Sequence, residues 1–184
     1  MRAVRYREAT AEDVEAIAQL HADSWRRNYR GAFRDAFLDG PVVGERRTVW
    51  AERLTRPATA TYTVVAAQKA VVVGFAHTVF DDDPIWGALV DNLHVVHDLK
   101  RHGVGRHLMA ASAQAVAQRR PDAGLYLWVL QQNTAAQGFY DAIGGTRVGE
   151  GVSEPPGGGT APSFRYAWPD PAALVRSAGG APAI

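Results

Sequence analysis

One stretch of this sequence, residues 89–109, constrains the fold more than any other. Its first half is apolar and β-branched, which is typical of a mostly buried strand. Its second half places Gly103 and Gly105 among cationic residues, and from Leu108 the apolar residues repeat at helical spacing. A strand that turns into a helix in this way leaves unpaired backbone N–H groups at the helix start. Those donors, together with the positive end of the helix dipole, favour binding of a phosphate group.

The side chains of the turn agree with this prediction. Gly103 and Gly105 carry none, so a bulky anion can approach the backbone closely. Lys100, Arg101 and Arg106 add positive charge at the same place. In the alternative interpretation, the glycines only shape a tight connection between strand and helix.

The composition narrows the class of protein. At 184 residues and a formal charge of +1, the chain is expected to form one domain, residues 1–168, and gives no electrostatic reason to expect nucleic-acid or membrane binding. It has neither an apolar run long enough to span a bilayer nor the apolar core of a signal peptide, so we expect a cytoplasmic protein. The absence of cysteine excludes disulfides, thiolate catalysis and Cys-ligated zinc, and no metal site is predicted. Residues 169–184 are rich in Ala, Pro and Gly and are expected to form a loosely ordered tail.

Apolar alternation predicts the strands, and apolar residues at helical spacing predict the helices. The expected strands are 4–7, 61–67, 71–80, the first half of 89–109, 125–130, 146–152 and 163–168. The expected helices are the segment capped by Thr10 and ending near Trp25, then 44–54, 103–120 and 133–143. The short turn between 61–67 and 71–80 predicts an antiparallel hairpin. Strand 125–130 is parallel to the central strand if the helix between them is a right-handed crossover.

Two motifs carry a resemblance to a known family. The first is Leu93-His94-Val95-Val96 followed by Lys100-Arg101-His102-Gly103-Val104-Gly105, and the second is Leu127-Trp128-Val129 followed by Asn133, Ala136, Phe139-Tyr140 and Gly144-Gly145. They resemble the GNAT family of acetyl-CoA-dependent N-acetyltransferases, in which a strand precedes Gln/Arg-x-x-Gly-x-Gly/Ala and a later strand precedes Asn-x-x-Ala-x-x-Phe-Tyr and a glycine turn. Lys100 stands where the family usually has Gln or Arg, and His97 stands where it usually has Pro.

The resemblance implies an α/β fold with a mixed, mostly antiparallel central sheet flanked by helices. In this fold one pair of parallel strands splays apart. Relatives in the family often form dimers, so the resemblance leaves a homodimer open.

The resemblance also implies a site for acetyl-CoA. Backbone N–H groups of residues 101–106 would hold the pyrophosphate, and backbone groups of Leu93 and Val95 would face the pantetheine arm and the thioester carbonyl. Asn133 would bond the arm, cap its helix, or do both. The residues implied to contact the cofactor are Leu93, His94, Val95, Lys100, Arg101, His102, Gly103, Val104, Gly105, Arg106, Asn133, Ala136 and Tyr140.

Acetyl transfer to an amine requires a neutral amine, a stabilised oxyanion and a protonated or sheltered thiolate. Deprotonating an amine of pKa about 10.4 at pH 7 costs roughly 4–5 kcal/mol, so a base matters most for a strongly basic substrate. Tyr140 matches the family's acid by position, and its alternative role is packing. Asp91 is the candidate base or amine ligand, because strand alternation places it on the same face as Leu93. His94 would then lie on the opposite face, where a structural role is favoured.

Aromatic residues before the central strand are candidates for the wall of an acceptor pocket. They are Trp25, Tyr29 and Trp86, with Asp91 as a polar contact. The alternative is that such residues belong to the core. The expected acceptor is a primary amine of a small molecule or peptide.

Two other functions fit the sequence less well. A nucleotide-binding oxidoreductase would need a third glycine near His107 or Leu108 and an acidic residue ending the next strand, and the sequence has neither. A non-catalytic acyl-CoA-binding module of the same fold would keep the phosphate turn but would not need Tyr140.

Overall fold

A sheet of seven strands, in the order β1-β2-β3-β4-β5-β7-β6, forms the centre of the computed structural model, which describes residues 3–56 and 58–179. The strands are β1 (Arg5–Glu8), β2 (Thr61–Gln68), β3 (Val71–Asp83), β4 (Gly87–Val95), β5 (Leu125–Leu130), β6 (Thr146–Ser153) and β7 (Ala161–Trp168). The helices are α1 (Val14–Asn28), α2 (Asp35–Asp39), α3 (Val42–Thr55), α4 (Val104–Arg119), α5 (Thr134–Ala142) and α6 (Pro171–Ser177), with short 3-10 turns at Ala11–Asp13 and His97–Leu99.

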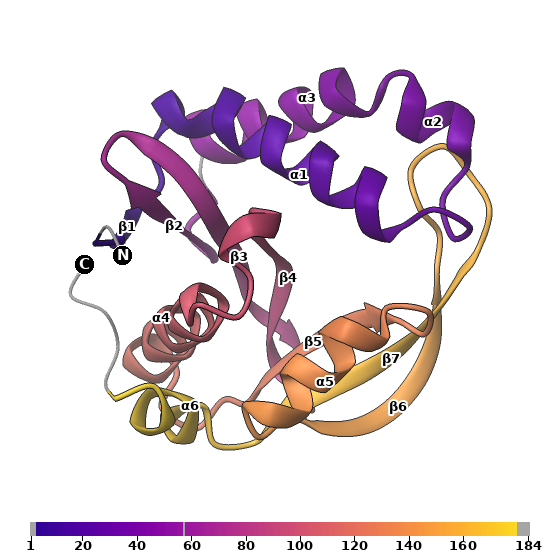
Figure 1. Ribbon diagram of the computed structural model, residues 1–184. Coiled ribbons are helices and arrows are strands. Elements are labelled where there is room, and N and C mark those ends of the chain that lie inside the picture. Colours follow the sequence, from indigo (N-terminus) through magenta and orange to yellow (C-terminus); the bar gives the residue numbers. More distant parts are fainter. Residues whose placement is uncertain (1–2, 57, 180–184) are drawn as a thin grey trace.

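The helices form two layers, one on each face of the sheet (Figure 1). Helices α1, α2 and α3 cover one face, and α4, α5 and α6 cover the other. Alternation in β5 divides its side chains between these layers, because Leu125, Leu127 and Val129 enter the core beneath α4 and α5. Tyr126 and Trp128 therefore face the side of α1 and α3.

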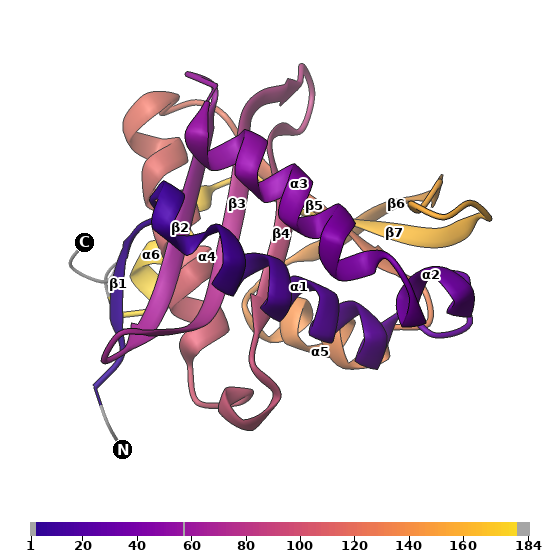
Figure 2. The same ribbon diagram turned by 90° about the horizontal axis from the view of Figure 1, so that it is seen from above.

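The parallel pair β4–β5 opens along its length. The two strands are in register only at Ala88 with Leu125 and at Leu89 with Tyr126. Beyond these pairs β5 continues with β7 and β6, which point away from β2, β3 and β4 (Figure 2). The predicted mixed sheet with a splayed parallel pair is confirmed.

A β-bulge in β4 changes the face on which one predicted site residue lies. Thr78 of β3 is opposite Val90, whereas His77 is opposite Asn92, so Asp91 is an extra residue in the ladder. Strict alternation puts Asp91 on the face of Leu93, and this prediction is wrong. The bulge turns Asp91 toward α3, whereas Leu93 packs on the α4 side.

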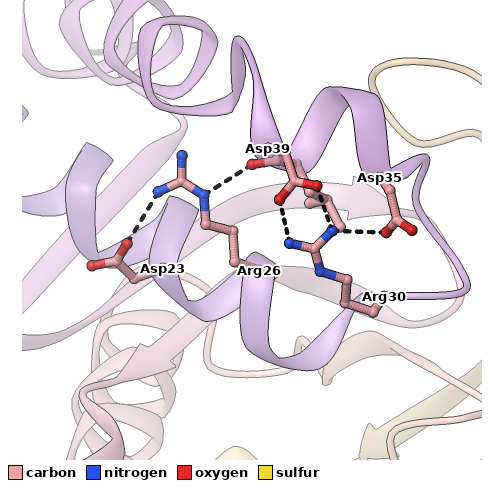
Figure 3. A network of polar contacts seen from close by, with 6 residues as sticks. Asp23, Arg26, Arg30, Asp35 and Asp39 are labelled. Carbon is pink, nitrogen blue, oxygen red and sulfur yellow. Dashed lines mark hydrogen bonds and ion pairs between the residues drawn. The ribbon is translucent and has the colours of Figure 1, made fainter.

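The first predicted helix ends later than expected, at Asn28, and α3 extends beyond both expected ends of the second, 44–54. Helix α2 forms in an aromatic stretch without a clear period. The buried Phe37 and Leu38 of α2 pack against α1, and ion pairs link α2 to the end of α1 at the surface (Figure 3). Arg30 contacts both Asp35 and Asp39, and Arg26 donates to the carbonyl oxygen of Leu38 at 2.9 Å. The fold places α2 next to the β6–β7 loop, where a Cβ built on Gly157 would lie 2.7 Å from Phe37.

The segment after Pro169 is more ordered than its composition indicates. Residues Pro171–Ser177 form α6, and Leu174 is 2 % exposed in the core with Met109 and Ala113 of α4. The expectation of a loosely ordered tail is wrong for this helix, because Leu174 and Val175 pack against the core and anchor it. Residues 180–184 of the expected tail lie outside the described residues. In the part of the chain that the structure describes, every helix is too short or too polar to cross a membrane.

Candidate acyl-CoA site

A pocket of about 770 Å³ follows the opening between β4 and β5 and continues to the start of α4. Its walls come from α1, β4, the turn before α4, β5 and α5. They are formed by Ser24, Asn28, Tyr29, Leu93, His94, Val95, His97, Lys100, Arg101, Gly103, Gly105, Arg106, Trp128, Val129, Asn133, Ala135, Ala136, Phe139, Tyr140, Ala142 and Ile143.

The turn before α4 presents free backbone donors to this pocket. Arg101 and Gly103 both have left-handed backbone conformations, with φ of 67° and 82°. Among the described residues, the N–H groups of residues 103–106 have no hydrogen-bond acceptor, and the first bond of the turn is His107 N–H to the carbonyl of Gly103 at 3.1 Å. These donors and the helix dipole form a site for an anion.

The side chains of the turn contribute less than its backbone. The Arg106 guanidinium donates to the carbonyl oxygens of Ser177 at 3.1 Å and Ala142 at 3.3 Å, so it ties α4 to the ends of α5 and α6. His102 Nδ1 lies 2.9 Å from the carbonyl oxygen of Lys100, and the Val104 side chain is buried in the core. The side chains of His102 and Val104 do not line the pocket, so contact of Val104 with a cofactor would be made by its free backbone N–H.

The edge of β4 offers polar groups inside the opening. Val96 N–H donates to the carbonyl of Val73 in β3 at 2.9 Å. Alternation therefore points the N–H and C=O groups of Leu93 and Val95 the other way, toward the side from which β5 has diverged. Together with the turn, this edge fits a ligand that has a pyrophosphate followed by an extended arm with amide groups, such as coenzyme A.

Asn133 and Phe139, on the α5 side of the pocket, complete this fit. Asn133 accepts a hydrogen bond from Ala136 N–H at 3.2 Å, so it caps α5 while also lining the pocket. A Cβ built on Gly105 would lie 3.3 Å from the Phe139 ring, so a side chain there would crowd the floor of the turn.

Tyr140 is buried, and its hydroxyl has no hydrogen-bond partner among the described residues. Burial raises the pKa of Tyr140, and the nearby Tyr29 raises it further. Burial and the charge of Asp91 likewise raise the pKa of Tyr29 to about 12. Both phenols therefore remain protonated at neutral pH, and both line the pocket.

Asp91 lies outside the pocket wall and is held by an arginine. Its Oδ2 lies 2.8 Å from Nη2 of Arg53, whose guanidinium lies 5.1 Å from the centre of the Trp50 ring. The amide of Asn92 also donates to Asp91. Sequence reasoning missed Arg53, because nothing near either residue marks a pair 38 positions apart along the chain, from 53 to 91.

His94 is buried against α1 on the face opposite Leu93. Its Nδ1 lies 2.8 Å from Ser24 Oγ, and its ring centre lies 4.5 Å from that of His21. Burial, together with the charges of Lys100 and Arg46, lowers the pKa of His94 to about 3. A neutral imidazole in this place packs the helix against the sheet and also forms part of the pocket wall.

Of the predicted acceptor-pocket aromatics, only Tyr29 reaches the pocket. Trp25 is 7 % exposed in a core cluster with Phe33 and Phe37, so the alternative interpretation holds for it. Trp86 lies away from the pocket, next to Arg165. The structure instead places Trp128 on the wall, and the alternation of β5 is the signal that could have indicated it.

Comparisons with known proteins agree with this geometry. The sequence profile of the acetyltransferase (GNAT) family matches residues 14–144. The uncharacterized N-acetyltransferase YuaI of Bacillus subtilis is 28% identical over 173 residues, covering 93% of this chain and 96% of the relative.

Solved structures share the fold. The PaiA N-acetyltransferase of Thermoplasma acidophilum in complex with coenzyme A has a TM-score of 0.68 at 15% identity, covering 90% of this chain and 99% of its own. Arabidopsis thaliana NAA60 in complex with acetyl-CoA has a TM-score of 0.68 at 16% identity, covering 90% of this chain and 98% of its own.

Proposed function

The chain belongs to the acetyltransferase (GNAT) family, and we propose that it transfers the acetyl group of acetyl-CoA directly to a primary amine of a small molecule or peptide within a ternary complex. The observation that carries the proposal is the pocket in the opening between β4 and β5, which ends at a turn whose N–H groups are free. The co-substrate supplies an activated thioester. The cysteine-free composition supports the cytoplasm as the compartment.

The proposed roles in binding follow from this geometry. The N–H groups of residues 103–106 hold the pyrophosphate, with Lys100 and Arg101 adding charge. Leu93 and Val95 bind the amide-bearing arm through their backbones, and a β4 N–H polarises the thioester carbonyl. Asn133 has a second lone pair on the oxygen that caps α5 and offers it to the arm.

Two side chains have proposed roles in the chemistry. Tyr140 donates its proton to the departing sulfur, because it is protonated, buried and free of other partners. Asp91 lies on the opposite face of the sheet from α4, which is the side from which an amine would approach. There it binds the ammonium group and accepts one of its protons, so that the neutral nitrogen attacks the thioester carbon while Tyr140 protonates the departing sulfur. Arg53 fixes the position of Asp91. The free hydroxyl of Tyr140 inside the pocket favours a catalytic protein over a non-catalytic acyl-CoA-binding module.

Ligand-induced stabilisation tests the proposal. Acetyl-CoA at a hundred times its Kd is expected to raise the Tm by about 5–10 °C, because a ligand that binds only the folded state adds its binding free energy to stability. NAD at the same concentration should leave the Tm unchanged. A panel of amines monitored by thiol release then identifies acceptors. An unchanged Tm at millimolar acetyl-CoA would overturn the proposed function.

A further inference from the structure

Arg165 of β7 is held among aromatic rings on the face of the sheet that α1 and α3 cover. Its guanidinium carbon lies 4.5 Å from the centre of the Trp128 ring and 5.4 Å from the centres of Trp86 and Tyr126. These contacts restrain a side chain that is usually mobile. A restrained guanidinium loses less entropy when it binds a ligand.

The Arg165 guanidinium forms no ion pair within 4 Å among the described residues, although the charge of Asp83 interacts with it from farther away. Its buried Nε has no acceptor among these residues. Asp82 and Asp83 lie near this aromatic cluster, and both carboxylates have other hydrogen-bond donors. Asp83 Oδ1 accepts from the N–H groups of Ile85 at 2.8 Å and Trp86 at 3.0 Å, and Asp82 accepts from the Tyr126 hydroxyl.

The position of Arg165 relates it to the pocket. Arg165 is directly opposite Trp128 in the β5–β7 ladder, so the two side chains share a face. Trp128 is 36 % exposed and lines the pocket. Arg165 is therefore separated from the pocket by the Trp128 side chain. It lies on the face of the sheet opposite α4 and α5, and in the proposed function the amine approaches from this face.

We propose that the acceptor amine also carries a carboxylate, as an amino acid or a short peptide does, and that Arg165 binds this carboxylate. The inference rests on the proposed function and names its substrate class. Arg165 is partly exposed, and the N–H fork of a guanidinium matches a carboxylate. The nearby Asp82 and Asp83 repel any anion, but they repel a doubly charged phosphate about twice as strongly as a carboxylate, so the singly charged group is favoured.

Matched pairs of acceptors test the inference. Alanine is compared with ethylamine, phenylalanine with phenethylamine, and lysine with cadaverine, and phosphoethanolamine serves as the phosphate-bearing amine. The wild-type kcat/KM is expected to favour the carboxylated member of a pair by about tenfold or more, the effect of a hydrogen-bonded charge pair. Arg165→Gln should remove this preference by raising the KM of the carboxylated amine, while Arg165→Lys should restore part of it.

The matched control is Arg147→Gln. Arg147 also stacks on a ring, that of Phe164, but on the neighbouring strand and paired with Glu150, so its removal should leave the acceptor preference unchanged. The KM for acetyl-CoA and the Tm gain with acetyl-CoA should be the same in all variants, which shows that the variants fold.

The outcomes separate the two proposals. Turnover of amines without a preference for the carboxylated member, a preference for phosphoethanolamine, or a preference that survives Arg165→Gln would each overturn the inference and leave the proposed function standing. Failure of every amine in the presence of bound acetyl-CoA would overturn both.

Discussion

Tyr140 shows how one side chain can be prepared for proton donation by its surroundings. The residue is buried, and the pKa of its phenol is raised by that burial. We expect Tyr140→Phe to lower kcat by about a hundredfold, within the range for loss of a general acid, because only the hydroxyl is removed. The KM for acetyl-CoA should change little, since the ring that lines the pocket remains. Steady-state kinetics with a fixed amine provide the measurement.

A neighbouring phenol supplies the control for this experiment. Tyr166 is also buried, and its ring centre lies 5.7 Å from that of Tyr140, yet it does not line the pocket. Tyr166→Phe should keep kcat within about twofold of the wild type, whereas the loss of a general acid costs far more. If Tyr140→Phe behaves in the same way, the acid role is wrong.

Asp13 is the residue whose charge most clearly contributes to stability. Its carboxylate is 5 % exposed and accepts from Arg7 at 2.7 and 2.8 Å and from Thr10 N–H at 2.9 Å. Burial alone raises the pKa of Asp13, but the hydrogen bonds from Arg7 and Thr10 outweigh it and the net pKa is lowered. Because the folded-state pKa lies below the unfolded value of about 3.9, the contribution is present above that pH and is lost as pH falls through the folded pKa.

Asp13→Asn should therefore lower the free energy of unfolding by about 2 kcal/mol at pH 7, and the difference from wild type should shrink at pH 3. Urea denaturation across this pH range measures both values. Asp35→Asn is the control, since Asp35 forms an exposed ion pair with Arg30 and should have an effect below about 0.5 kcal/mol. An effect of Asp13→Asn that stays constant with pH would contradict the assignment.

For single residues, the sequence predicts those roles that depend on neighbouring residues in the chain. The roles of Gly103 in the turn and Asn133 as a cap follow from their immediate neighbours. The face of Asp91 does not, because the bulge in β4 depends on pairing with β3. Its partner Arg53 comes from a helix that only the tertiary fold brings near.

At the scale of elements, the function depends on the junction of β4 and α4. Gly103 has a φ of +82°, where an L-residue is strained, yet a Cβ there would meet nothing closer than 3.7 Å. Gly103→Ala should therefore lower stability by about 1–2 kcal/mol through backbone strain. It should also weaken acetyl-CoA binding, because relaxation of the turn would move the N–H groups. Calorimetric titration and thermal unfolding measure the two effects.

Gly138 in α5 is the matched control. A Cβ there meets no atom within 4 Å, so Gly138→Ala should raise stability by up to about 1 kcal/mol through helix propensity and leave cofactor affinity unchanged. Equal acetyl-CoA affinity in the Gly103 and Gly138 variants would show that the conformation of the turn is unimportant for binding.

Strands and helices with a strong apolar periodicity are predicted well, and α2, which lacks one, is not. The strand 125–130 matches β5, and the helix 103–120 differs from α4 by one residue at each end. Helix α2 has only five residues, too few for a period, and its Phe37 and Leu38 are buried in a core cluster with Trp25. Such an element follows from tertiary packing, to which the exposed ion pairs of Arg30 add little.

At the scale of the whole molecule, α6 joins the layer of helices that carries the turn. Leu174 is 2 % exposed and packs with Met109 and Ala113 of α4. Leu174→Ala should lower the free energy of unfolding by about 2–4 kcal/mol, the usual result of emptying a buried leucine site. Denaturant titration measures this loss.

Arg176 supplies a control on the same helix. It forms an exposed ion pair with Asp170 at 2.8 Å, so Arg176→Ala should change stability by less than about 0.5 kcal/mol. A loss for Leu174→Ala no larger than that of the Arg176 variant would mean that α6 adds nothing to the core.

The separation of β4 from β5 affects the resistance of the protein to proteolysis as well as its chemistry. Only two residue pairs join β4 to β5, so a ligand bound in the opening between them would add contacts between the two parts of the sheet. Such a ligand would contact both strands, so we expect acetyl-CoA to slow proteolysis of this part of the sheet.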